Sequence, residues 1–137
     1  MPMPPPPGGQ ADSPSHDQPG LAMLDLPRLR GICPDAAQLN RLLILAREHL
    51  HSDLVRMRAA LERGDAVAAA ERVHHIKGAA CMLCRAGDGL LGQLDAARAA
   101  MLGCVTMPVI ADEVKLMEDG LLKLDLQLLA ALHGPAA

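Results

Sequence analysis

The 137-residue sequence contains no phenylalanine, tyrosine or tryptophan. A hydrophobic core must therefore be built from leucine, isoleucine, valine, methionine and alanine, and this composition favours helices over sheets. The absence of aromatic rings also removes the stacking platforms with which proteins bind single-stranded nucleic acids. The composition thus predicts a helical protein and gives no support for nucleic-acid binding.

Excess positive charge and long apolar runs are missing as well. The net charge of −3 provides no electrostatic attraction to nucleic acids or to an anionic membrane surface. Apolar runs such as Leu42–Ala46 are far shorter than the about 20 residues of a membrane-spanning helix. No charged segment followed by an apolar one opens the chain, as a secretory signal would, and four cysteines without a regular framework are typical of reduced thiols. We therefore expect a cytoplasmic protein with no membrane insertion and no nucleic-acid partner.

The chain divides into a tail and one domain. Residues 1–20 contain seven prolines and three glycines, a composition that buries too little apolar surface to offset ordering, so we expect a disordered tail or linker there. The remaining residues, 21–134, suffice for a single core. A start at Met1 with a proline-rich tail fits both a free-standing protein and the C-terminal part of a longer one.

Apolar residues recur at intervals of three and four, the spacing of helices that bury one face in a bundle. We expect a short helix over about 24–31 and longer helices over about 36–63, 66–83 and 88–102. A last helix opens at Pro108 and is closed by Gly134-Pro135. Pro34-Asp35 and Gly64-Asp65 supply breaks and caps between helices. Because the connections are short, the sequence predicts an all-α fold, an antiparallel four-helix bundle with a short additional N-terminal helix.

The segment 74–80, His-His-Ile-Lys-Gly-Ala-Ala, lies within the expected helix 66–83. At about 100° per residue, Lys77 lies about 60° from His74 on one side and Gly78 about 40° on the other. An imidazole, an ammonium and a bare backbone therefore share one strip of the helix. The apolar face lies elsewhere and consists of Ala69, Val73, Ile76, Ala80 and Leu83. His74 is thus expected to point away from the core, where another protein can approach it.

This run resembles the phosphoacceptor motif of histidine-containing phosphotransfer (HPt) domains, H-x-[IL]-K-G-x-[AS], the relay modules of multistep two-component signalling. The resemblance extends more loosely over about residues 24–132, through the order and lengths of the helices. It implies that His74 is the phosphoacceptor, that Ile76 is buried, that Lys77 stabilises charge and that Gly78 permits the close approach of a partner.

The chain departs from the HPt pattern at the end of this helix. The family usually has a glycine six residues after the Lys-Gly pair, and this chain has Cys84 there. Gly87 and Gly89 follow closely, and we expect them to supply the flexible turn instead.

The resemblance implies a phosphocarrier and not an enzyme with turnover of its own. His74 would take a phosphoryl group from a receiver-domain aspartate and pass it to another receiver domain. The expected partners are response-regulator receiver domains and a hybrid histidine kinase, to which the chain could itself belong. No glycine-rich phosphate loop or ATP site is visible, and no cofactor or metal is expected on this chain. The Mg²⁺ would be held by the partner receiver domain.

Neighbouring residues suggest rival interpretations. His75 lies about 100° further round the helix, beside Glu71, and lacks a cation three residues on, so spacing selects His74. A non-phosphorylated helical adaptor would use the same face only for docking. A thiol- or metal-responsive protein would use Cys81 and Cys84, whose side chains meet at i and i+3. His74 cannot join them around one metal, because Cys81 is about 10.5 Å away along the helix axis.

Overall fold

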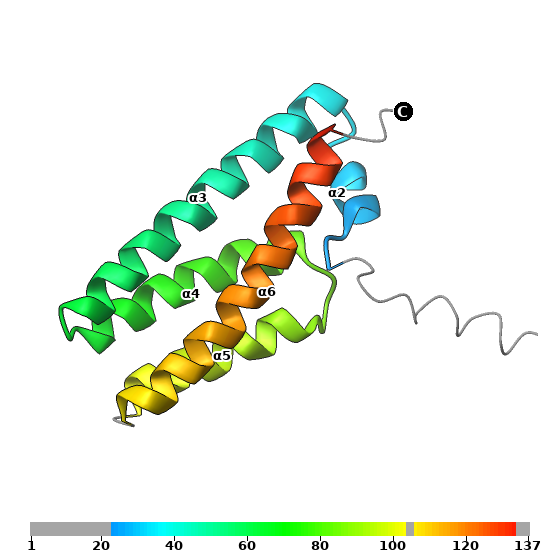
Figure 1. Ribbon diagram of the computed structural model, residues 1–137. Helices are drawn as coiled ribbons and strands as arrows, with labels where there is room; N and C mark the ends of the chain where they lie inside the picture. The colour runs from blue at the N-terminus through cyan, green and yellow to red at the C-terminus, as the bar shows by residue number, and fades with distance from the viewer. Residues whose placement is uncertain (1–22, 104–105, 134–137) are drawn as a thin grey trace, which may run out of the picture.

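The computed structural model of the protein describes residues 23–103 and 106–133 (Figure 1). Within these ranges the chain is all-helical, as the composition predicted. The helices are α2 (Leu26–Ile32), α3 (Ala36–Glu62), α4 (Ala66–Leu83), α5 (Gly89–Leu102) and α6 (Met107–His133). Across this part of the chain, no helix is both long enough and apolar enough to cross a membrane. The expected disordered tail (1–20) and the expected stop at Gly134-Pro135 lie outside the described residues.

The four long helices lie lengthwise beside one another (Figure 1). Each contacts the next along the chain, and α6 also contacts α3. Helix α2 packs against α3 and lies at the end of the molecule where α3 begins and α6 ends. Because α4 packs closely on both α3 and α5, one of its faces is covered and the opposite face points outward.

Local sequence signals place the helix ends. Asp35, Asp65 and Asp88 precede α3, α4 and α5, and each accepts a hydrogen bond from a backbone N–H two or three residues on, at 2.8, 3.0 and 2.9 Å. These bonds satisfy amide groups that have no partner within the helix. Gly64 and Gly87 turn the chain with φ of 79° and 78°, a region that side chains disfavour. The turn expected after Cys84 is therefore confirmed at Gly87, whereas Gly89, also expected in this turn, is the first residue of α5.

The core is aliphatic and follows the predicted spacing of apolar residues. The most completely buried of its large side chains are Leu29, Leu43, Met57, Val73, Ile76, Leu83, Leu90, Leu94, Met117, Leu124 and Leu128. Leu50, Leu54 and Leu61 of α3 follow the same spacing of three and four residues but are only partly buried. They lie toward α6, on which α3 packs less extensively than on α4.

The first helix begins two residues later than expected, at Leu26. Asp25 provides the reason, because its carboxylate accepts a hydrogen bond from Arg28 N at 3.2 Å and so caps the helix. Leu24 lies before this cap, forms an antiparallel bridge with Cys84 and is 4% exposed. The chain leading into α2 is thereby attached to the end of α4.

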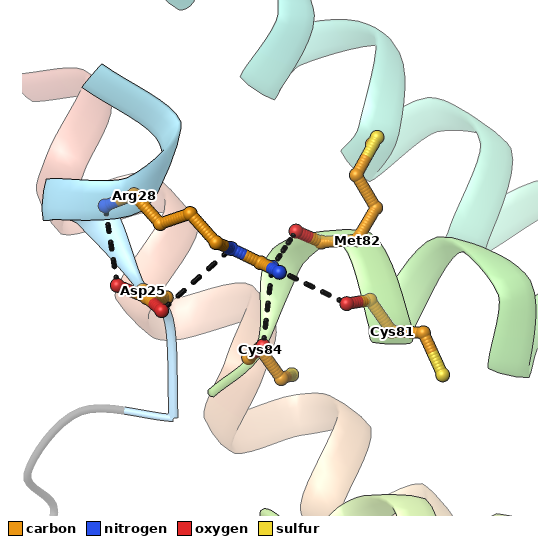
Figure 2. A network of polar contacts seen from close by, with 5 residues as sticks. All are labelled: Asp25, Arg28, Cys81, Met82 and Cys84. Carbon is orange, nitrogen blue, oxygen red and sulfur yellow. Dashed lines mark hydrogen bonds and ion pairs between the residues drawn. The ribbon is translucent and has the colours of Figure 1, made fainter. Parts of the chain in front are cut away.

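Arg28 fixes the C-terminal end of α4 (Figure 2). Its Nη2 donates to the carbonyl oxygens of Cys81 and Cys84, both at 3.3 Å, and to that of Met82. Asp25 Oδ2 lies 3.7 Å from Arg28 Nε and steadies the guanidinium. Carbonyl groups at a helix C-terminus lack intrahelical partners and carry partial negative charge. A cation there donates hydrogen bonds to these carbonyl groups and offsets their charge. Helix α2 thus anchors the helix that carries the histidine motif.

Candidate functional site

The orientation of α4 is set by its buried side chains. Val73, Ile76 and Ala80 are 0% exposed and face the core, whereas His74 is exposed. Because α4 is capped by Asp65 at one end and held by Arg28 at the other, rotation that would bury His74 is opposed at both ends. The imidazole therefore lies on the outward face, accessible to another macromolecule.

Lys77 does not extend freely into solvent one turn after His74. Its Nζ lies 2.7 Å from Oδ1 of Asp95, which belongs to α5. The two side chains are 35% and 58% exposed, so the ion pair spans the edge of the α4–α5 contact and remains open to water. The hydrogen bond to Asp95 is the main influence that raises the pKa of Lys77, which keeps the ammonium charged.

Arg98 adds a second cation to this edge. Its charge acts on Lys77 and opposes the rise of the Lys77 pKa, which places it within electrostatic range. Helices α4 and α5 run in opposite directions (Figure 1). His74 precedes Lys77 by three residues on α4, and Arg98 follows Asp95 by three residues on α5. Because the helices are antiparallel, both steps lead in the same direction, by about 4.5 Å along the helix axes. The register of the ion pair thus brings Arg98 to the level of His74.

Gly78 leaves open space beside His74. A Cβ added to Gly78 would find no atom of a neighbouring element within 4 Å, and the residue is exposed. Internal packing therefore does not require glycine at this position. A glycine in a helix interior costs about 1 kcal/mol relative to alanine, so its presence is consistent with the close approach of another molecule.

His75 is exposed as well but has different surroundings. Its ring centroid lies 6.4 Å from that of His74, with 62° between the ring planes. The residue three positions on is Gly78, so His75 has no cation at the spacing that places Lys77 beside His74. The two histidines are neighbours, and only His74 belongs to the strip that includes Lys77.

Cys81 and Cys84 do not form a matched pair of thiols. Cys81 is exposed, whereas Cys84, whose backbone bridges to Leu24, is 1% exposed. Burial raises the pKa of the Cys84 thiol to about 12, so it stays protonated near neutral pH. The thiolate is the form that attacks and binds metals. In residues 23–103 and 106–133, no group of three or more His, Cys, Asp or Glu side chains is placed to hold a metal ion.

Two residues at this edge escaped the sequence analysis, Asp95 and Arg98. Each is an ordinary charged residue on the exposed side of α5 when the sequence is taken alone. Their spacing of three positions, which puts both on one side of a helix, is a signal that becomes meaningful once α4 and α5 are paired. The contact itself depends on how far the two helices are shifted along one another.

A groove lies between α3 and α6. Leu50, Leu54, Leu121 and Leu122 line it. Two ion pairs join the helices there, Arg47 Nε to Asp125 Oδ1 at 2.6 Å and Arg58 Nε to Glu118 Oε2 at 2.8 Å. This groove lies between a different pair of helices from the edge that holds Lys77 and Asp95.

Comparisons of the chain with family models, with curated proteins and with solved structures find no match.

Proposed function

We propose that the protein is a phosphocarrier in a multistep two-component relay, with His74 as the residue that carries the phosphoryl group. The donor and the recipient are aspartates of response-regulator receiver domains, one of which can belong to a hybrid histidine kinase. The carrier has no ATP site of its own and acts in the cytoplasm. We further infer that α3 to α6 form an antiparallel four-helix bundle with α2 as an additional N-terminal helix.

One observation carries the proposal: His74 lies on the outward face of a helix fixed at both ends, with Lys77 one turn on and open space at Gly78. A nucleophile of this kind must be accessible to a second protein and must not be enclosed in a catalytic pocket. The small residue beside it lets the partner's aspartyl phosphate approach in line with the imidazole. The exposure of His74 makes the nucleophile accessible, and the space at Gly78 leaves room for the partner's aspartyl phosphate.

The transfer step needs no cofactor on this chain. The lone pair of one ring nitrogen of neutral His74 attacks phosphorus, and the bond between phosphorus and the aspartyl oxygen breaks. Its electron pair leaves with the partner's carboxylate. The other ring nitrogen keeps its proton, so the product is a phosphoimidazolium together with a free aspartate. An imidazole suits this chemistry because its neutral form has a nitrogen lone pair available for attack while the other ring nitrogen holds the proton.

Charge stabilisation is shared between the two proteins. A loose phosphoryl-transfer transition state spreads negative charge over the equatorial oxygens, and cations around it lower the barrier. Lys77 supplies one cation from this chain, and Arg98 lies at the same edge. The Mg²⁺ belongs to the receiver domain.

A non-phosphorylated adaptor is the second candidate function. It is favoured by the leucine-lined groove between α3 and α6, which would serve for docking in place of the histidine face. Leu122 lines this groove and is 58% exposed. Such a protein would bind its partner without forming a covalent intermediate. A thiol- or metal-responsive function has less support, because Cys84 is buried and its thiol is protonated.

Phosphotransfer from a panel of receiver domains separates these functions. Each receiver domain would be labelled with acetyl [³²P]phosphate and mixed with the full chain. We expect at least one domain to transfer label to the chain as a phosphohistidine, which is labile in acid and stable in alkali. Binding of a receiver domain without any label on the chain would favour the adaptor. Label that survives acid would show a different kind of modification.

A further inference from the structure

Asp95 holds the one lysine that shares the His74 strip. The distance of 2.7 Å between Lys77 Nζ and Asp95 Oδ1 is that of a charge-assisted hydrogen bond. A lysine ammonium has three donors, and one of them is directed at α5 rather than toward His74. In the structure described here, the cation expected to stabilise a phosphoryl group therefore already has a partner.

The ion pair between Lys77 and Asp95 can be broken with little loss of folding free energy. Both side chains are in contact with water, and exposed ion pairs contribute little to stability because solvent screens them. Neither residue is part of the core, and the packing of α4 on α5 depends on buried apolar side chains such as Leu94 and Ala97. Lys77 can thus leave Asp95 without a change in the fold.

A phosphoryl group on His74 is a stronger competitor for the lysine. It carries close to two negative charges and three acceptor oxygens, whereas Asp95 carries one negative charge. Lys77 lies one turn from His74 on the same strip of α4, about 4.5 Å along the axis. A flexible four-carbon side chain can turn back across that distance.

We propose that Asp95 is a positioning residue for phosphotransfer, which holds Lys77 on α5 while His74 is unmodified and gives it up when His74 carries a phosphoryl group. This role rests on the proposed function of His74. The exchange makes and breaks no covalent bond, since Lys77 stays protonated and Asp95 stays ionised and becomes solvated. Because Asp95 competes with the phosphoryl group, it lowers the share of phosphate that rests on His74 at equilibrium.

The test is the equilibrium constant for transfer from a labelled receiver domain to the full chain. Asp95→Asn frees Lys77, and we expect it to raise this constant about two- to fivefold, the range of an exposed ion pair. Asp95→Glu keeps the carboxylate and should return the constant to the wild-type value. Asp119→Asn is the matched control, because it removes the same charge from an exposed pair with Lys115 on α6. It should leave the constant unchanged.

A second background distinguishes pairing from simple charge repulsion. In Lys77→Met, the substitution Asp95→Asn should have little effect, because there is no lysine to release. The proposal is overturned if Asp95→Asn leaves the constant unchanged or lowers it, if its effect persists undiminished in Lys77→Met, or if Asp119→Asn raises the constant equally. Wild-type protein that no receiver domain labels would instead overturn the function of His74, and this role of Asp95 with it.

Discussion

Gly120 of α6 lies against Gln93 of α5, so closely that a Cβ added to the glycine would stand 2.6 Å from Gln93 Oε1. The same Cβ would stand 2.8 Å from Leu90 Cδ1, and Leu90 is only 2% exposed. Both distances are shorter than side chains tolerate. The amide end of Gln93 can turn aside, but the buried Leu90 has little room. Gly120 is thus a glycine that internal packing requires, in contrast to Gly78.

This contrast predicts different outcomes for the same glycine-to-alanine substitution at the two positions. Gly78→Ala should raise the free energy of unfolding by about 1 kcal/mol, because alanine favours the helix and its methyl group has space. Gly120→Ala carries the same gain in helix propensity but overpacks the α5–α6 contact, so its free energy of unfolding should lie about 1–3 kcal/mol below that of Gly78→Ala. Urea unfolding of both variants measures the difference. Equal stabilities would show that Gly120 has unexpected room.

A larger side chain at Gly78 tests docking separately from chemistry. Gly78→Leu retains His74 and Lys77 and adds bulk where a partner must approach. We expect the variant to keep its helical circular dichroism and its cooperative unfolding, while transfer from receiver domains is lost. If the leucine variant fails to fold, the position serves internal packing after all. If it folds and transfers at the wild-type rate, the partner does not approach His74 across this face.

Burial of Cys84 predicts a pH dependence of stability. The pKa of its thiol is raised to about 12 from an ordinary 9.0, so between these values the folded chain keeps a proton that the unfolded chain loses. The stability that the protonated Cys84 thiol contributes is therefore fully present below about pH 9. As the pH rises toward 12, the free energy of unfolding falls by about 1.4 kcal/mol per pH unit at most. Urea unfolding between pH 8 and 11 should show a steeper decline for wild type than for Cys84→Ala. Parallel declines would contradict the assignment.

Arg28 should stabilise the fold from outside the core. Its guanidinium serves three carbonyl groups at the end of α4, so Arg28→Ala should lower the free energy of unfolding by about 1–2 kcal/mol. Arg30→Ala provides the control, because Arg30 is an exposed arginine of the same short helix. Thermal unfolding followed by circular dichroism compares the two variants. Equal melting temperatures would mean that water caps α4 as well as Arg28 does.

Local signals predicted the helices well, and the reason is chemical. Asp35 and Gly64-Asp65 act within a few residues of their positions, so the ends of α3 and the start of α4 could be inferred without knowing the rest of the fold. The apolar spacing likewise predicted which faces are buried, because burial selects residues at intervals of three and four. Position 74 followed from this as an exposed position of α4.

Contacts between distant segments could not be inferred in this way. The pairing of Lys77 with Asp95 depends on the shift between two helices, which their separate sequences do not specify. Leu24 was expected inside the first helix, whereas its backbone pairs with Cys84, 60 residues along the chain. Gln127 of α6 accepts hydrogen bonds from the Met23 and Leu24 amides at 2.9 and 3.0 Å, and no local pattern indicated it.

The central claim is that His74 alone carries the phosphoryl group, and a comparison of two neighbouring histidines tests it most directly. The full chain, His74→Gln and His75→Gln would each be incubated with the ³²P-labelled receiver domain that labels the wild type, and the acid-labile label on the chain would be counted. Because both histidines are exposed on α4 and only His74 shares a strip with Lys77, we predict that His74→Gln abolishes the label and that His75→Gln retains most of it. Label that persists in His74→Gln, or that is lost only in His75→Gln, would contradict the account.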